Sequence, residues 1–81
     1  MNMTTEKLER ILAKSKPITG EMVLISQRIY GDIKNGTREQ AFFKDEFGET
    51  EEKREKHVKW LEKNGFKVYY DGYIFYNVMW T

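Results

Sequence analysis

The single histidine and the acidic side chains are the residues of this sequence with the clearest capacity for chemistry. Zinc and other transition metals usually need several His or Cys ligands, but the chain contains only His57 and no cysteine. Carboxylates that could form an acid–base pair gather in one stretch: Asp45, Glu46, Glu49, Glu51 and Glu52. Basic residues lie on both sides of these acids, which is typical of a solvated surface. We therefore expect no metal site, no cofactor and no catalytic residue, and hence no enzyme.

His57 lies within a helix that we expect over residues 51–64. On that helix it shares the inward arc with Val58, Trp60 and Leu61. A histidine in such a position is more often a buried, hydrogen-bonded residue than a pH-sensitive one. We expect a structural role for it.

A row of basic side chains on the same helix is the only pattern that could contact nucleic acid. It consists of Lys56, Lys59 and Lys63, with Trp60 beside it. Glu52 and Glu55 each precede a lysine by four residues, which favours ion pairs on the helix surface. The whole chain has 14 bases and 13 acids, a balance that argues against a dedicated nucleic-acid-binding protein. DNA binding therefore stays the alternative function.

The final stretch of the chain is unusually aromatic. Its large rings are Phe66, Tyr69, Tyr70, Tyr73, Phe75, Tyr76 and Trp80. They exceed what one small core comfortably holds, and tyrosine is enriched at protein interfaces because it combines contact area with a hydrogen-bonding tip. We expect a protein partner, from a host or a virus, or a second copy of the chain. The predicted contact residues are Trp60, Tyr69, Tyr73, Ile74, Tyr76 and Val78.

A helix that leads into a hairpin must position these rings. Thr50 is a good N-cap for a helix over 51–64, and Asn64-Gly65 provides the stop. The runs 66–70 and 73–80 are rich in β-forming residues, and Asp71-Gly72 between them predicts a two-residue type I′ turn. That turn would pair Tyr70 with Tyr73 and Val68 with Phe75.

This register predicts which side of the hairpin is buried. Phe66, Val68 and Phe75 would pack on the helix, because Phe66 directly follows the helix stop. The opposite side would carry Tyr69, Ile74, Tyr76 and Val78 and be available to the N-terminal helices or to a partner.

Helical spacing also dominates the first half of the chain. Thr4 or Thr5 can cap a first helix, which ends before Pro17. Thr19 can cap a second helix over residues 20–34, which Asn35-Gly36 closes. Because residues 22–25 also have strand composition, helix and strand both remain open for this segment.

A third helix is expected over residues 38–47, since Thr37 and Gln40 have the spacing of a capping box and Gly48 follows as a stop. Its apolar side chains spread around more than half of the helix. At least one of its phenylalanines should therefore be poorly buried or pack on another element.

Together these elements predict one α+β domain over residues 1–81, with three to four short helices followed by a C-terminal β-hairpin. The first twenty residues are charged, and no apolar run approaches the roughly 18 residues of a membrane span. With no cysteine in the sequence, we expect a cytoplasmic protein without signal peptide or membrane contact.

Two resemblances involve the end of the chain. The step Leu61-Glu62-Lys63-Asn64-Gly65-Phe66-Lys67-Val68, followed by Tyr73-Ile74-Phe75, resembles the helix and hairpin of winged-helix proteins. The same tail is similar to short proteins of phages and prophages of Gram-positive bacteria. The second resemblance implies an origin in a phage or mobile element. Our main expectation is therefore a small binding protein of this type that modulates a protein partner through its aromatic hairpin and the adjacent helix. The first implies a winged-helix DNA-binding transcriptional regulator as the alternative.

Overall fold

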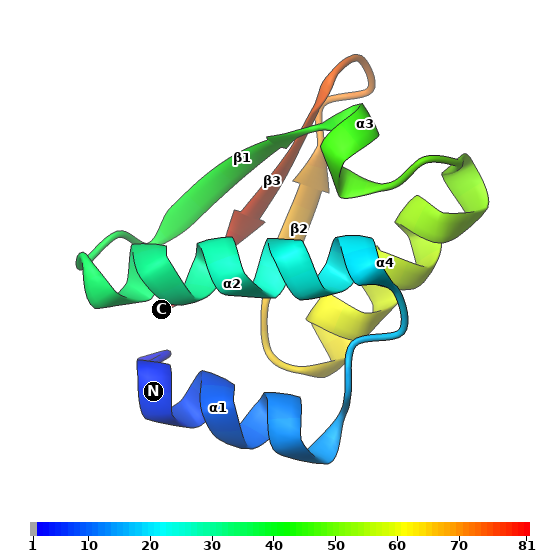
Figure 1. Cartoon of the computed structure of the whole chain (residues 1–81). Helices are drawn as coiled ribbons and strands as arrows, with labels where there is room; N and C mark the ends of the chain where they lie inside the picture. The colour runs from blue at the N-terminus through cyan, green and yellow to red at the C-terminus, as the bar shows by residue number, and fades with distance from the viewer. Residues whose placement is uncertain (1) are drawn as a thin grey trace.

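The structure is a computed structural model that describes residues 2–81. In this part of the chain, four helices and a three-stranded antiparallel sheet form an α+β fold, which confirms the predicted class (Figure 1). The elements are α1 (Thr5–Lys14), α2 (Gly20–Lys34), β1 (Glu39–Phe43), α3 (Lys44–Phe47), α4 (Glu51–Lys63), β2 (Lys67–Tyr70) and β3 (Phe75–Met79).

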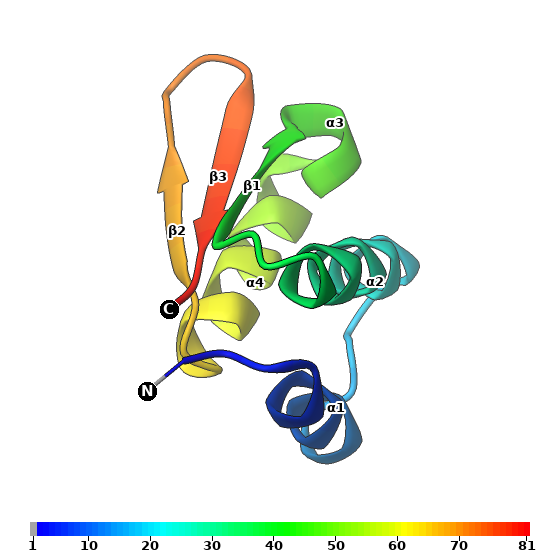
Figure 2. The ribbon, with the colours of Figure 1, turned by 90° about the vertical axis from the view of Figure 1, so that its left-hand side faces the viewer.

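The sheet has the strand order β1-β3-β2, so the last strand lies between the other two. Figure 2 shows α2, α3 and α4 on one side of this sheet. Because side chains alternate across a strand, each strand has an inner set facing the helices and an outer set facing away. The outer set forms a surface that we name the outer face. It consists of Glu39, Ala41, Phe43, Lys67, Tyr69, Phe75, Asn77 and Met79.

Threonine caps begin the three longer helices, as the sequence predicts. Each threonine hydroxyl accepts a hydrogen bond from the backbone N–H three residues later, which satisfies an otherwise free donor of the first turn. The capping pairs are Thr4 with Lys7, Thr19 with Met22 and Thr50 with Lys53. Residues 20–34 are a helix, which decides the alternative that the sequence left open.

The expected helix over residues 38–47 is wrong in its first half. Residues 39–43 form β1, which pairs with β3 so that Phe42 lies opposite Tyr76. Only residues 44–47 are helical. The strand satisfies the apolar pattern better, because its alternation buries Phe42 (2% exposed) and leaves Phe43 outside (51% exposed). The poorly buried phenylalanine that the pattern indicated is thus Phe43.

The helix stop before the hairpin is confirmed. Gly65 has a φ of 95°, a left-handed conformation that a Cβ atom would strain. The N–H of Phe66 donates to the carbonyl of Leu61 and the N–H of Gly65 to that of Glu62, which is the bonding of a Schellman cap. Phe66 then enters the core at 3% exposure.

The predicted hairpin register is wrong. Val68 pairs with Val78 rather than with Phe75, and Tyr70 pairs with Tyr76. A type I′ turn needs a positive φ at both of its central residues, which would be Asp71 and Gly72. Gly72 has a φ of 81°, but the φ of Asp71 is not positive. The loop is longer than two residues because the carboxylate of Asp71 binds the backbone that follows it.

This change of register also corrects the predicted faces of the hairpin. Tyr76 and Val78 point to the inner side together with Val68, and their exposures are only 7% and 0%. The sequence predicts both on the free side, which is wrong. Phe75 instead belongs to the outer face.

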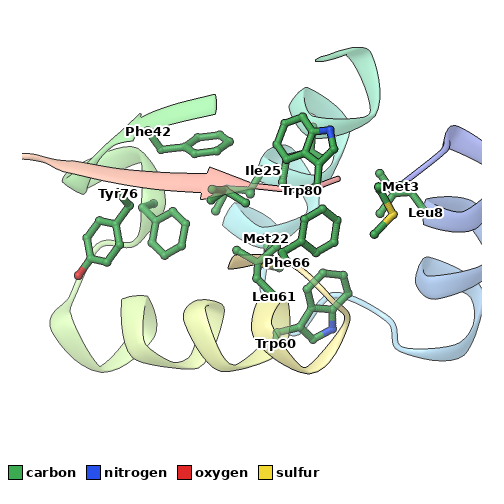
Figure 3. Close-up of a cluster of buried hydrophobic side chains, with 13 residues drawn as sticks. Met3, Leu8, Met22, Ile25, Phe42, Trp60, Leu61, Phe66, Tyr76 and Trp80 are labelled. Carbon is green, nitrogen blue, oxygen red and sulfur yellow. The ribbon is translucent and has the colours of Figure 1, made fainter. Parts of the chain in front are cut away.

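The core lies between the inner side of the sheet and the helices, as the close-up in Figure 3 shows. Its buried apolar side chains are Met3, Leu8, Met22, Ile25, Ile29, Phe42, Phe47, Trp60, Leu61, Phe66, Tyr76, Val78 and Trp80. The chain ends are tied to this core, since the N–H of Met3 donates to the carbonyl of Thr81. The indole N–H of Trp80 donates to the carbonyl of Thr37 over 3.0 Å.

Candidate functional site

A cluster of exposed apolar side chains occupies the end of the hairpin. We name it the tip surface and define it as Phe43, Tyr70, Tyr73 and Ile74, which are 51%, 36%, 79% and 38% exposed. Tyr73 and Ile74 belong to the loop between β2 and β3, whereas Phe43 is the last residue of β1 and Tyr70 the last residue of β2. Solvation of this many large apolar groups at one end of a small protein is unfavourable, which makes this end the candidate site.

The end of β1 lies against the hairpin loop. The N–H of Lys44 donates to the carbonyl of Ile74 over 2.7 Å, and the rings of Phe43 and Phe75 have centroids 5.0 Å apart. Between them is a cleft of about 300 Å³, lined by Phe43, Lys44, Asp45, Tyr73 and Ile74. The tip surface is therefore hollowed rather than flat, and a partner side chain can enter it.

Asp71 gives the loop its shape. One carboxylate oxygen accepts hydrogen bonds from the N–H groups of Tyr73, Ile74 and Phe75 at 2.7, 2.9 and 3.2 Å. Donation by the N–H of Tyr73 is the main reason that the pKa of this carboxyl lies below its ordinary value. The loop backbone is thus fixed while the side chains of Tyr73 and Ile74 remain in solvent.

Tyr70 joins the loop to the core. Its ring stacks on that of Tyr76 with centroids 4.2 Å apart, and the ring of Tyr76 stacks on that of Phe47 at 4.4 Å. The hydroxyl of Tyr70 donates to the carbonyl of Tyr73 over 3.2 Å. This column of rings fixes the position of the tip relative to α3.

The structure divides the six predicted contact residues into two groups. Tyr69, Tyr73 and Ile74 are exposed, with Tyr69 on the outer face at 62%. The other three, Trp60, Tyr76 and Val78, lie in the core at 8%, 7% and 0% exposure. The sequence reasoning missed Phe43, because a helix was expected where β1 brings this ring beside the loop.

The lysine row of α4 is exposed as predicted, and its charges are mixed with acids. Nζ of Lys56 lies 3.8 Å from a carboxylate oxygen of Glu52, which confirms one of the two expected ion pairs. The first turn of α4 carries Glu51 as well as Glu52. Trp60 does not extend this row, because it faces inward.

His57 has the structural position that we expected. It is fully buried, and its ring lies edge-on to Phe47 at 5.9 Å. Nδ1 is 2.5 Å from the carbonyl oxygen of Phe47 and must donate to it, because a carbonyl can only accept. Nε2 is 2.6 Å from the hydroxyl of Thr19, which also accepts from the N–H of Met22. Both ring nitrogens therefore have hydrogen-bond partners inside the protein.

A second cleft, of about 410 Å³, lies between α1 and α2. Its lining is mostly apolar and includes Leu12, Pro17 and Val23. At its edge the hydroxyl of Tyr30 donates to Glu9 over 2.9 Å, and this bond raises the pKa of Tyr30. None of the predicted partner-contact residues and none of the lysines of the α4 row line this cleft.

Within residues 2–81, no group of three or more His, Cys, Asp or Glu side chains is placed to hold a metal ion. In the same part of the chain, no helix has the length and apolar character needed to cross a membrane.

Comparisons with protein-family models, curated proteins and solved structures give no match to this chain. The resemblances of the tail to winged-helix and phage proteins therefore stay predictions.

Proposed function

We propose that this chain is a small, non-catalytic binding protein of the type carried by phages and mobile elements, and that it modulates a host or viral protein in the cytoplasm. The tip surface is the main contact, and the adjacent α3 and the outer face flank it. The observation that carries the proposal is the clustering of Phe43, Tyr73 and Ile74 around a cleft on a loop whose backbone is already fixed.

Rigidity and chemistry both support this reading. Aromatic side chains lose few rotamers on binding, and a loop held by Asp71 loses little backbone entropy. Lys44 and Asp45 at the edge of the cleft provide both signs of charge next to an apolar centre. An apolar centre with a polar rim is the usual composition of a protein–protein interface.

The alternative, a winged-helix DNA-binding regulator, is favoured by the exposed lysines of α4 next to a hairpin. The charges of the hairpin loop do not support it. Residues 71–74 include no lysine or arginine, and the loop carries the negative charge of Asp71. Since phosphate contacts dominate DNA affinity, an acidic and aromatic loop suits a protein partner better.

Affinity capture from extracts of the encoding cell tests the proposal. The parent chain should capture a defined protein, and a Tyr73→Ser, Ile74→Ser double variant should lose about 30-fold in affinity for it, the usual effect of losing a central contact. The matched control is Ile18→Ser with Leu24→Ser, which removes two apolar side chains of similar exposure (52% and 66%) elsewhere on the surface.

Equal capture by the parent and the tip variant would contradict the proposal. The DNA alternative is tested separately by gel shift at low and high salt with the Lys56, Lys59 and Lys63 triple change to glutamate. Binding that falls steeply with salt and is lost in that variant would replace the proposed function with the alternative.

A further inference from the structure

The outer face of the sheet is a second uncovered surface, distinct from the loop. In the part of the chain that the structure describes, the helices lie on the other side of the sheet (Figure 2). Tyr69 is 62% exposed on this face. An aromatic side chain of that exposure on an open sheet indicates a layer that is incomplete in the isolated chain.

The strand register arranges this face in rows across the three strands. One row is Glu39 on β1, Met79 on β3 and Lys67 on β2. The next row is Ala41, Asn77 and Tyr69 in the same strand order. In the first row, β1 has an acid (Glu39) where β2 has a base (Lys67). In the second row, β1 has a small side chain (Ala41) where β2 has a large one (Tyr69).

The charged pair of the first row is not used within the described chain. The ion pairs found among residues 2–81 involve neither Glu39 nor Lys67, and both side chains are exposed. The two residues are separated by the whole width of β3. The register thus leaves one free negative and one free positive group at opposite edges of a single row.

A two-fold axis that runs parallel to β3 between two stacked sheets places β1 of one copy over β2 of the other. When two copies of the outer face are stacked about such an axis, Glu39 and Ala41 of β1 each lie over their row partner on β2 of the other copy. Glu39 then faces the other copy's lysine, and Ala41 faces its tyrosine, each contact occurring twice. Asn77 and Met79 lie near the axis and meet their own copies, and an amide can both donate to and accept from an identical amide.

We propose that these two rows of the outer face form a homodimer interface in which two sheets stack as a sandwich. Aligned sheets pack about 10 Å apart, with strands at about 30° to each other, and the register supplies the charge and size complementarity that this packing requires. The occupant is a second copy rather than an unrelated protein, because both complementary pairs are formed by the face with itself. The tip surface lies beyond these two rows, so the dimer does not depend on the proposed function.

Sedimentation of the full chain over a range of concentrations tests the proposal. The parent chain should show a monomer–dimer equilibrium. Glu39→Lys and Lys67→Glu should each weaken the dimer about tenfold or more, because like charges then meet at two symmetric contacts. Glu6→Lys makes the same charge change on α1 and should leave the dimer unchanged. All three substituted side chains are exposed, so the fold should survive, and circular dichroism checks this.

Mixing the two weakened variants gives the decisive measurement. A Glu39→Lys chain has two bases at these positions and a Lys67→Glu chain has two acids, so the mixture should form a heterodimer with the parent's affinity. If Glu39 and Lys67 paired only within one chain, mixing the two variants would not restore association. A monomeric parent chain, a dimer insensitive to the single changes, or a mixture that fails to associate would each overturn the proposal. The Tyr73→Ser, Ile74→Ser variant should dimerise like the parent, which separates this result from the function of the tip surface.

Discussion

Two polar side chains, His57 and Asp71, each make more than one hydrogen bond within the protein, but one is buried and the other is exposed. His57 is fully buried and connects α4 with Phe47 at the end of α3 and with Thr19 at the start of α2. Asp71 is exposed, and its bonds reach only the next four residues of its own loop. The first joins segments that are far apart in the sequence, and the second shapes one loop.

The comparison distinguishes contacts that stabilise the whole fold from contacts that shape only the candidate site. Loss of a buried polar contact leaves unpaired groups in a low-dielectric interior and destabilises the whole domain. Loss of a solvent-exposed contact costs less, because water replaces it. Substitutions at His57 should therefore destabilise the whole domain, whereas substitutions in the loop should change mainly the shape of the tip surface.

His57→Ala should have the largest effect. It leaves the carbonyl of Phe47 without its donor and creates a cavity beside the ring of Phe47, so we expect a loss of about 3 kcal/mol in the free energy of unfolding. Urea denaturation measures this value. The control Lys59→Ala changes an exposed residue of the same helix and should cost less than about 0.5 kcal/mol. A similar loss in both variants would show that the histidine does not connect the helices.

The sequence predicted the helices better than the sheet, for a physical reason. Caps at Thr4, Thr19 and Thr50 and the stop at Gly65 are local signals, and all four function as predicted. The pairing of β1 with β3 joins residues more than thirty positions apart. No local pattern indicates such a contact, and the capping-box spacing at Thr37 favoured a helix instead.

The candidate site was predictable only in part, because it depends on the loop. Tyr73 and Ile74 were singled out as contact residues, and they are exposed. Tyr76 and Val78 were placed on the free side because Asp71-Gly72 indicated a two-residue turn. The side-chain bonds of Asp71 lengthen that loop, and the resulting odd change of register moves every side chain of β3 to the other face relative to β2.

Gly72→Val should have an intermediate effect and tests whether the loop is fixed. Gly72 has a φ of 81°, and a Cβ atom at this position would meet no atom within 4 Å, so the expected cost of about 1 to 2 kcal/mol comes from the backbone alone. Thermal denaturation measures it. The matched control is Gly31→Ala within α2, where space is also open and φ is not positive; it should stabilise the protein by up to about 1 kcal/mol. An unchanged melting temperature for the valine variant would mean that the loop backbone readily adopts another conformation.

Asp71→Asn should have the smallest effect, and its pH dependence tests the local character of the loop. The pKa of Asp71 lies below its ordinary value of 3.8 in the folded protein, mainly because of the N–H of Tyr73. The ionised carboxylate therefore stabilises the fold above that ordinary value, and this stabilisation is lost as the pH falls through the lower folded pKa. The melting temperature of the parent should exceed that of the variant near neutral pH, and the two should converge in acid.

Faster amide exchange in the Asp71→Asn variant should be confined to residues 73–75. The exposed Asp45→Asn serves as the control for general charge effects. A difference independent of pH, or faster exchange that extends into α4, would show that Asp71 acts on the whole domain as His57 does.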